Sequence, residues 1–203
     1  MHWTDCEFVG RDFRDDDLSR LQTERVLFTE CDFSGVNLAE SEHRGSAFRN
    51  CMFNLTTLWH STFRQCSMLG SVFVRCRLRP VTLDEVDFTL AVLGGNDLRG
   101  VDLSGCRMRE ANLVEADLRK TLLCGADLTG TRTTGTRMED ADLRRGHRRF
   151  VGVDNRVTGG GAHRYRPSAG VRGGTRTPSR WRARSVTLGL QRLSRIFQRT
   201  YPA

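Results

Sequence analysis

A hydrophobic residue recurs every five positions from Phe8 to Leu143. Of the 28 sites in this register, 25 hold Phe, Leu or Met, and the exceptions are Thr23, His43 and Thr133. All nine Phe residues before position 145 lie in the same register. A period of five fits neither the 3.6 residues of an α-helix nor the 2.0 of a plain strand, so the pattern predicts a chain that turns every five residues.

A second column of residues lies two positions before each hydrophobic site and holds small side chains, which indicates that it also faces inward. Its members include Ser46, Ser61, Ser71, Ala91, Val101, Ala111, Ala116, Thr121, Ala126 and Ala141. Six of the seven cysteines, Cys6, Cys31, Cys51, Cys66, Cys76 and Cys106, share this column, and only Cys124 does not. These thiols are expected to pack as small apolar groups. An odd number of cysteines without a CxxC pair argues against a disulfide framework and a zinc site.

The position between the two columns favours Asp or Asn and is expected to face solvent. Examples are Asp12, Asp17, Asp32, Asn37, Asp97, Asp102, Asn112, Asp117, Asp127 and Asp142. Two examples of the resulting five-residue unit are Ala-Asp-Leu-Arg-Lys at 116–120 and Ala-Asp-Leu-Thr-Gly at 126–130.

These units resemble those of the pentapeptide-repeat family. The resemblance implies an all-β fold, a right-handed quadrilateral parallel β-helix with four pentads per coil and about seven coils. A 20-residue coil should place every fourth central residue on one face. Leu18, Leu38, Leu58, Leu78, Leu98, Leu118 and Met138 form such a ladder, and Phe13, Phe33, Phe53 and Phe73 begin another. Thr23 and His43 are consecutive rungs of a third ladder, so the polar exceptions are expected to lie together.

The net charge of +8 suggests a nucleic-acid binder until it is divided along the chain. Residues 1–145 carry net −4, whereas residues 146–203 carry 13 Arg, one acid and net +12. We therefore predict a β-helix domain over 1–145 and a basic Arg/Gly-rich tail over 146–203, for which disorder is the default.

Within the tail, Val186, Leu190, Leu193 and Phe197 have helical spacing. Three interpretations stay open: a nucleic-acid or membrane-surface arm, a divergent cap or dimerisation segment, and an out-of-frame translation.

Other function classes find little support in the residues. No apolar run reaches the roughly 18 residues of a membrane span, and the N-terminus lacks the features of a secretory signal, so a soluble cytoplasmic protein is expected. Buried cysteines are poor nucleophiles, and His60 has no partner on neighbouring pentads, so we expect no enzyme. Gly94, Gly95, Gly100 and Gly105 are expected at corners rather than in a phosphate loop. No cofactor, metal or small-molecule substrate is predicted.

Within the family, the longer segments 6–21, 31–51, 56–63, 66–73 and 87–100 are similar to mycobacterial fluoroquinolone-resistance members. That resemblance implies a DNA mimic that binds and inhibits DNA gyrase and protects it from fluoroquinolones. It also implies a homodimer formed through a short C-terminal helical segment, which we do not find in residues 146–203. The alternatives are a structural interaction module with an unrelated partner and DNA binding through the basic tail.

Acidic residues are the candidates for partner binding. The predicted site comprises Asp87, Asp97, Asp102, Asp117, Asp127 and Asp142, with Asp12 and Asp32 at the other end. Each Asp could instead serve only to hydrogen-bond a turn. Stacking should also bring Asp12 over Asp32 and Asp97 over Asp117, about 4.8 Å apart, which costs stability unless neutralised.

The predicted surface is only partly like DNA. Seven coils give a rod of about 34 Å, which would need on the order of 20 negative charges to match duplex. Residues 43–83 hold no acid and six arginines, Arg44, Arg49, Arg64, Arg75, Arg77 and Arg79. This Arg belt would repel a DNA-binding groove or pair with acids of a partner, so only the two ends can imitate DNA.

Overall fold

The structure, a computed structural model, describes residues 1–145. These residues all belong to one compact unit. The predictions made for the tail concern residues outside this range. Within residues 1–145, no helix has the length and apolar character needed to cross a membrane.

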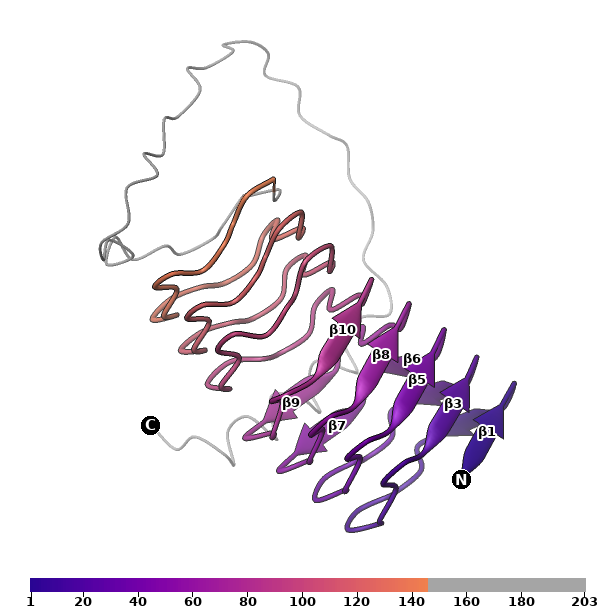
Figure 1. The fold of residues 1–203 in the computed structure, drawn as a ribbon. Helices are drawn as coiled ribbons and strands as arrows, with labels where there is room; N and C mark the ends of the chain where they lie inside the picture. Colours follow the sequence, from indigo (N-terminus) through magenta and orange to yellow (C-terminus); the bar gives the residue numbers. More distant parts are fainter. Residues whose placement is uncertain (146–203) are drawn as a thin grey trace, which may run out of the picture. The chain divides into compact units, whose positions relative to one another are not determined.

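Short parallel strands stack coil upon coil (Figure 1). They are β1 (His2–Thr4), β2 (Glu7–Val9), β3 (Gln22–Glu24), β4 (Leu27–Thr29), β5 (Glu42–Arg44), β6 (Ala47–Arg49), β7 (Met52–Asn54), β8 (Thr62–Arg64), β9 (Val72–Val74) and β10 (Thr82–Asp84). Each is centred on a residue of the hydrophobic register. We number the coils from residue 1 in steps of 20, so that coil 1 is 1–20 and coil 7 is 121–140.

Four faces run along the stack. Face 1 is the sheet β1-β3-β5-β8-β10, face 2 contains β2-β4-β6, and face 3 contains β7-β9. Face 4, centred on Leu18 and every twentieth residue after it, is joined by single bridges such as Asp17↔Asn37. The pairing offset is 20 residues from His2↔Gln22 to Leu122↔Asp142, which confirms the predicted pentapeptide-repeat β-helix.

An Asp or Asn directly before the central residue of a pentad favours a turn over a strand. None of the ten strands begins with Asp or Asn, and every pentad with Asp or Asn at that position forms a turn. The reason is visible at Asp12, whose Oδ1 accepts the backbone N–H of Arg14 at 2.9 Å. The adjoining β-turn is closed by a bond from the N–H of Asp16 to the carbonyl of Phe13 at 3.0 Å. A short acceptor side chain therefore competes with the extended conformation.

Corners require a left-handed backbone. Asp15, His60 and Gly95 have φ of 60°, 58° and 66°, values that glycine adopts with least strain. Gly94 differs from the prediction because it precedes the corner. A Cβ there would come within 2.8 Å of the Val114 carbonyl oxygen of the next coil, so this glycine permits close stacking.

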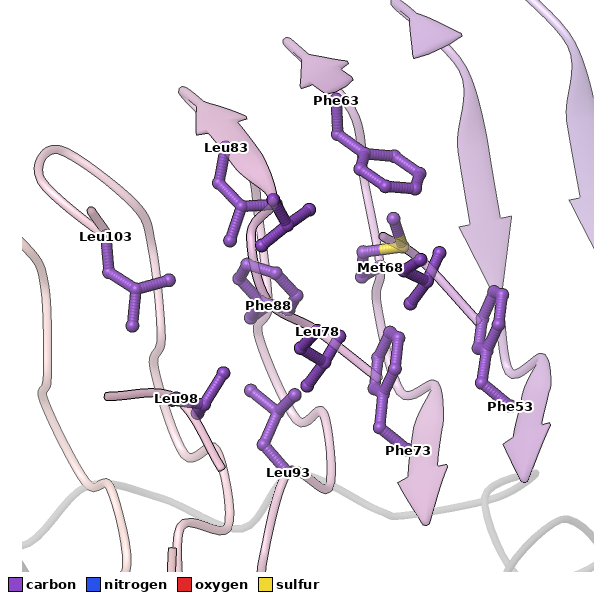
Figure 2. Close-up of a pocket in the computed structure, with 12 residues that line it drawn as sticks. Phe53, Phe63, Met68, Phe73, Leu78, Leu83, Phe88, Leu93, Leu98 and Leu103 are labelled. Carbon is purple, nitrogen blue, oxygen red and sulfur yellow. The ribbon is translucent and has the colours of Figure 1, made fainter. Parts of the chain in front are cut away.

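The core consists of the predicted ladders. On face 3, Phe13, Phe33, Phe53 and Phe73 stack with successive ring centroids 4.9, 5.1 and 4.7 Å apart. Figure 2 shows where this aromatic ladder gives way to leucine: Phe73 is followed by Leu93, and Phe63 on face 1 by Leu83. The smaller side chains leave an apolar cavity of about 20 Å³ at that junction.

The two polar rungs are adjacent, as predicted: Thr23 pairs with His43 in register. The buried Ser46 hydroxyl donates to the Arg44 carbonyl at 3.3 Å, so the Thr23 hydroxyl donates to Ser46 at 2.9 Å. His43 must then donate from Nδ1 to Thr23 at 2.7 Å, and its Nε2 accepts from the Ser41 hydroxyl at 2.9 Å. Burial lowers the pKa of His43 to about 3, so the imidazole is neutral. The network supplies each buried hydroxyl with a partner.

Candidate functional site

The predicted acidic residues are distributed over all four faces of the solenoid. Asp102 and Asp142 lie on face 1, Asp87 and Asp127 on face 2, Asp12 and Asp32 on face 3, and Asp97 and Asp117 on face 4. A flat partner can contact one or two adjacent faces. The fold therefore does not bring the eight carboxylates together into one site.

All eight also support the backbone. In each, Oδ1 accepts the N–H of the residue two positions later, at 2.9–3.2 Å. This is the turn hydrogen bond that the sequence allowed as an alternative role. This turn bond engages only Oδ1, and the second carboxylate oxygen, Oδ2, still faces solvent or another side chain.

Four of the eight are followed two residues later by arginine, and each of the four forms an ion pair with it. The closest N–O distances are 2.5 Å for Asp12–Arg14, 2.7 Å for Asp97–Arg99, 2.7 Å for Asp117–Arg119 and 2.6 Å for Asp142–Arg144. Hydrogen bonding from Arg14 lowers the pKa of Asp12 to about 2. Hydrogen bonding from Arg99 and from Arg144 holds the pKa of Asp97 and of Asp142 well below the usual range.

Stacked acids are held together by shared arginines. Asp12 pairs with Asp32 in register, and Arg14 also lies 3.9 Å from Asp32. Arg99, bound to Asp97, lies 3.7 Å from Asp117 of the next coil. The expected repulsion along each ladder is thus neutralised, and these stacked carboxylates contribute little net negative charge.

A different group of acids keeps its charge. Asp84 of coil 5 and Asp102 of coil 6 lie on face 1, and Glu85 lies at the corner between faces 1 and 2; within residues 1–145 none of the three forms an ion pair. We call these three residues the face-1 acidic cluster. Glu85 accepts a hydrogen bond from the neutral amide of Gln65 at 3.1 Å, and Asp102 caps only its own turn. Of the eight predicted residues, the cluster contains Asp102 alone.

Sequence reasoning missed Asp84 and Glu85, although a signal was present. The motif Asp-Phe/Leu-Arg marks four of the ion-paired acids, and Asp102 is followed by Leu-Ser instead. Asp84 and Glu85 lie after the central residue of their pentad, where a carboxylate does not cap the turn. Counting arginines two residues away would have identified four of the paired acids, but not Asp32, Asp87 and Asp127, which lie 3.9, 3.9 and 3.6 Å from arginines of other pentads.

The Arg belt encircles the solenoid. Arg44 and Arg64 are register partners on face 1, Arg49 is on face 2, Arg75 is at the corner of faces 3 and 4, and Arg77 is on face 4. Arg79 also lies on face 4 and pairs with Asp97 at 2.8 Å, so this member of the belt is neutralised within the chain.

The groups considered for catalysis are dispersed or buried. His60 contacts Trp59 at the surface, with ring centroids 4.2 Å apart, and His43 lies in the core. Burial raises the pKa of Cys66 and Cys106 to about 11 and that of Cys76 to about 12. Cys31 departs from the expectation for buried thiols, because its interaction with the neighbouring Cys51 thiol lowers the pKa of Cys31 and raises that of Cys51. Within the described part of the chain, no three metal-ligating side chains gather in one place.

Comparison with known proteins identifies the class to which this fold belongs. The family profile described as "Pentapeptide repeats" matches residues 31–70, 71–109 and 106–145. The matched segments cover more than half of the sequence, and the chain belongs to the pentapeptide repeat family.

Within that family, the chain is 81% identical over 105 residues to the pentapeptide repeat protein MfpA of Mycobacterium tuberculosis, a match that covers 52% of this chain and 57% of that protein. It is 75% identical over 59 residues to MfpA of Mycolicibacterium smegmatis, covering 29% of this chain and 31% of that protein. The predicted resemblance to mycobacterial members is thereby confirmed. The chain spans little more than half the length of the first relative and about a third of the second.

Among solved structures, HetL, a pentapeptide repeat protein involved in heterocyst differentiation regulation from the cyanobacterium Nostoc, is 19% identical. The alignment covers 70% of this chain and 86% of that chain, with a TM-score of 0.49.

Proposed function

We propose that this protein is a DNA mimic that binds and inhibits DNA gyrase and protects the enzyme from fluoroquinolones. The similarity to the MfpA proteins supports the choice of partner. The observation that carries the proposal is the face-1 acidic cluster, three carboxylates on adjacent coils that form no ion pair within residues 1–145, although Asp84 is the register partner of Arg64. Gyrase acts on DNA in the cytoplasm, so the proposal requires a cytoplasmic location.

Unneutralised acids are the ones that can attract a basic groove. An Asp already bound to arginine adds almost no net charge, and it can release that arginine only at a cost in free energy. We therefore assign the leading role to Asp84, Glu85 and Asp102. Asp87, Asp97, Asp117, Asp127, Asp142, Asp12 and Asp32 are proposed as supporting members of the acidic surface.

The proposed mimicry is local. The described residues carry net −4, whereas duplex of the same length would carry on the order of 20 charges. Contact with the acidic ends, and not with the Arg belt, is consistent with this difference. Faces 1 and 2 together hold the whole of the net negative charge, since the acids and bases of faces 3 and 4 balance.

A gyrase supercoiling assay with the full chain tests the proposal. The triple variant Asp84→Asn/Glu85→Gln/Asp102→Asn removes three charges and should weaken inhibition about tenfold or more. It should fold, because Asn makes the same turn bond in this chain: Asn37 and Asn112 accept from Ala39 and Val114 at 3.1 and 3.0 Å.

The matched control is Arg20→Gln/Glu40→Gln, which removes an exposed ion pair (2.9 Å) that is not among the proposed contacts and should inhibit almost as well as the unaltered chain. Absence of inhibition by the unaltered chain would overturn the gyrase proposal. Equal inhibition by the triple variant and the unaltered chain would exclude the face-1 acidic cluster as the contact. Fluoroquinolone-induced DNA cleavage, measured with the same variants, should be suppressed in the same order.

A further inference from the structure

Face 3 carries an apolar surface in its middle that the proposed gyrase contact does not use. Its outward positions from coil 3 to coil 6 are Met52, Asn54, Val72, Val74, Val92, Gly94, Asn112 and Val114, all half-buried. None of these eight residues is charged. We call this set the face-3 patch. Leu55 and Leu90, exposed by 59% and 52%, lie at its two borders.

The other faces differ at the same level of the stack. The corresponding outward positions include Glu42 and Arg64 on face 1, Arg49 and Asp87 on face 2, and Arg77 on face 4. Four of the eight positions of the face-3 patch hold Val and one holds Met, and an uncharged, largely apolar surface bordered by charged residues is the type of surface that proteins use to bind one another.

Two charged residues flank the patch in one corner column. Arg75 lies at the corner of coil 4, Gly95 at that of coil 5 and Glu115 at that of coil 6. Within residues 1–145, neither Arg75 nor Glu115 forms an ion pair. Two coils separate them, about 9.6 Å, which is too far for them to pair with each other inside one chain. The column is therefore positive on one side of coil 5 and negative on the other.

We propose that the face-3 patch binds the face-3 patch of a second copy of this chain, with the two solenoid axes antiparallel. The two-fold axis would lie along the strand direction at coil 5, so that coil 4 of one copy faces coil 6 of the other. Arg75 of each copy then meets Glu115 of the second copy. Val74 likewise faces Val114 of the second copy, and Val92 and Leu90 face their own equivalents.

Charge decides the orientation. If the solenoids were parallel, each coil would face the same coil across the interface, and the two corner columns would exchange sides. Glu115 would then oppose Glu110 of the second copy, while Arg75 would oppose only Gly70. Like charges across an interface are unfavourable, so the antiparallel arrangement is selected. From coil 3 to coil 7 it places no two like charges opposite each other.

Size sets the strength of the association. Five coils at about 4.8 Å give a face about 24 Å tall, and three extended residues with their corners span roughly 13 Å. The contact is then roughly 300 Å² per copy, below the roughly 800 Å² of a standard interface. We expect a reversible dimer that forms at tens to hundreds of micromolar protein, as weak interfaces of this kind do. This contact is independent of the proposed gyrase binding and of any pairing through the C-terminal segment.

Sedimentation equilibrium of the full chain, from about 5 to 500 μM, tests the arrangement by charge exchange. Arg75→Glu alone and Glu115→Arg alone each create two like-charge contacts and should weaken the dimer about fivefold or more. The double variant Arg75→Glu/Glu115→Arg should restore it. Both side-chain types are compatible with these corners, where Arg25, Glu85 and Glu110 adopt φ of 53°, 52° and 55°.

A second pair of variants tests the apolar centre. Val92→Lys places two ammonium groups against each other on the two-fold axis and should abolish the dimer. Leu122→Lys, at an exposed apolar position on face 1, is the matched control and should leave association unchanged. A chain that stays monomeric up to 500 μM overturns the proposal. So does a dimer that is insensitive to Val92→Lys, or one that the double charge exchange fails to restore.

Discussion

Coils 1–4 and coils 5–7 build the same four faces from different side chains. The face-3 ladder is aromatic from Phe13 to Phe73 and continues as Leu93, Leu113 and Thr133, and the small inward column changes from mainly Cys and Ser to a mixture of Ala, Val and Thr. Asp or Asn stands directly before the central residue in four of 16 pentads in coils 1–4 and in six of 12 pentads in coils 5–7. Nine of the ten strands lie in coils 1–4, and turns dominate afterwards, also in pentads such as those of Val92 and Leu122 that have neither Asp nor Asn at this position.

The comparison shows that coil geometry does not depend on a particular core residue. The inter-coil hydrogen bonds continue unchanged through the junction, as in the bonds from Phe73 to Val92 at 2.8 Å and from Leu93 to Asn112 at 2.8 Å. The backbone ladder fixes the spacing, while the core residues determine how much free energy each coil contributes. The two halves should therefore differ in local stability while sharing one architecture.

The largest expected effect is on the aromatic ladder. Phe53→Ala removes a fully buried ring that stacks on Phe33 and Phe73, and it should lower the free energy of unfolding by about 4 kcal/mol. Leu113→Ala on the same face in coil 6 should cost about 3 kcal/mol. Urea denaturation followed by circular dichroism measures both. A larger loss of unfolding free energy for Leu113→Ala than for Phe53→Ala would contradict the proposed difference in local stability between coils 1–4 and coils 5–7.

The second effect concerns pH and is confined to coils 1–4. His43 has a pKa of about 3 in the folded chain, below its ordinary value near 6.5. Between these two values the unfolded chain binds a proton that the folded chain does not, so stability falls as pH decreases. From pH 6.5 to 5 the loss should be about 2 kcal/mol, at about 1.4 kcal/mol per pH unit.

His43→Gln should remove most of this slope, and unfolding measured at several pH values between 7 and 5 reports it. The lowered pKa of Asp97 and of Asp142 acts in a separate window, since stability gained above their ordinary pKa is lost only as pH falls below about 4. Thr133, the polar rung of coil 7, does not titrate. An unchanged slope between pH 7 and 5 in the Gln variant would contradict the assignment to His43.

The smallest effect concerns the turns that dominate coils 5–7. Asp102→Ala removes the acceptor for the N–H of Ser104, 2.9 Å away, and should cost about 1 kcal/mol. Asp102→Asn keeps the acceptor and should cost almost nothing. Glu42→Ala, at the equivalent position of a strand pentad in coil 3, is the matched control with no turn bond to lose. Thermal unfolding of the three variants should rank Asp102→Ala as the least stable.

The candidate site was only partly predictable. The sequence identified the outward Asp column and the turn bond that each residue makes, because both depend on neighbours within one pentad. It did not identify Asp84 and Glu85 as acids that form no ion pair. Nor did the sequence show that Arg79 forms an ion pair with Asp97, since these residues are 18 positions apart and lie on successive coils.

By itself, the sequence determined the five-residue period, the 20-residue coil, the inward ladders and the adjacency of Thr23 and His43. Repetition makes these features local, because every pentad repeats the same choice of inward and outward positions. Tertiary structure alone decided which charges remain unpaired and which outward residues share a face. Both depend on how far a side chain reaches across the gap of about 4.8 Å between coils, a distance that exists only once the coils have stacked.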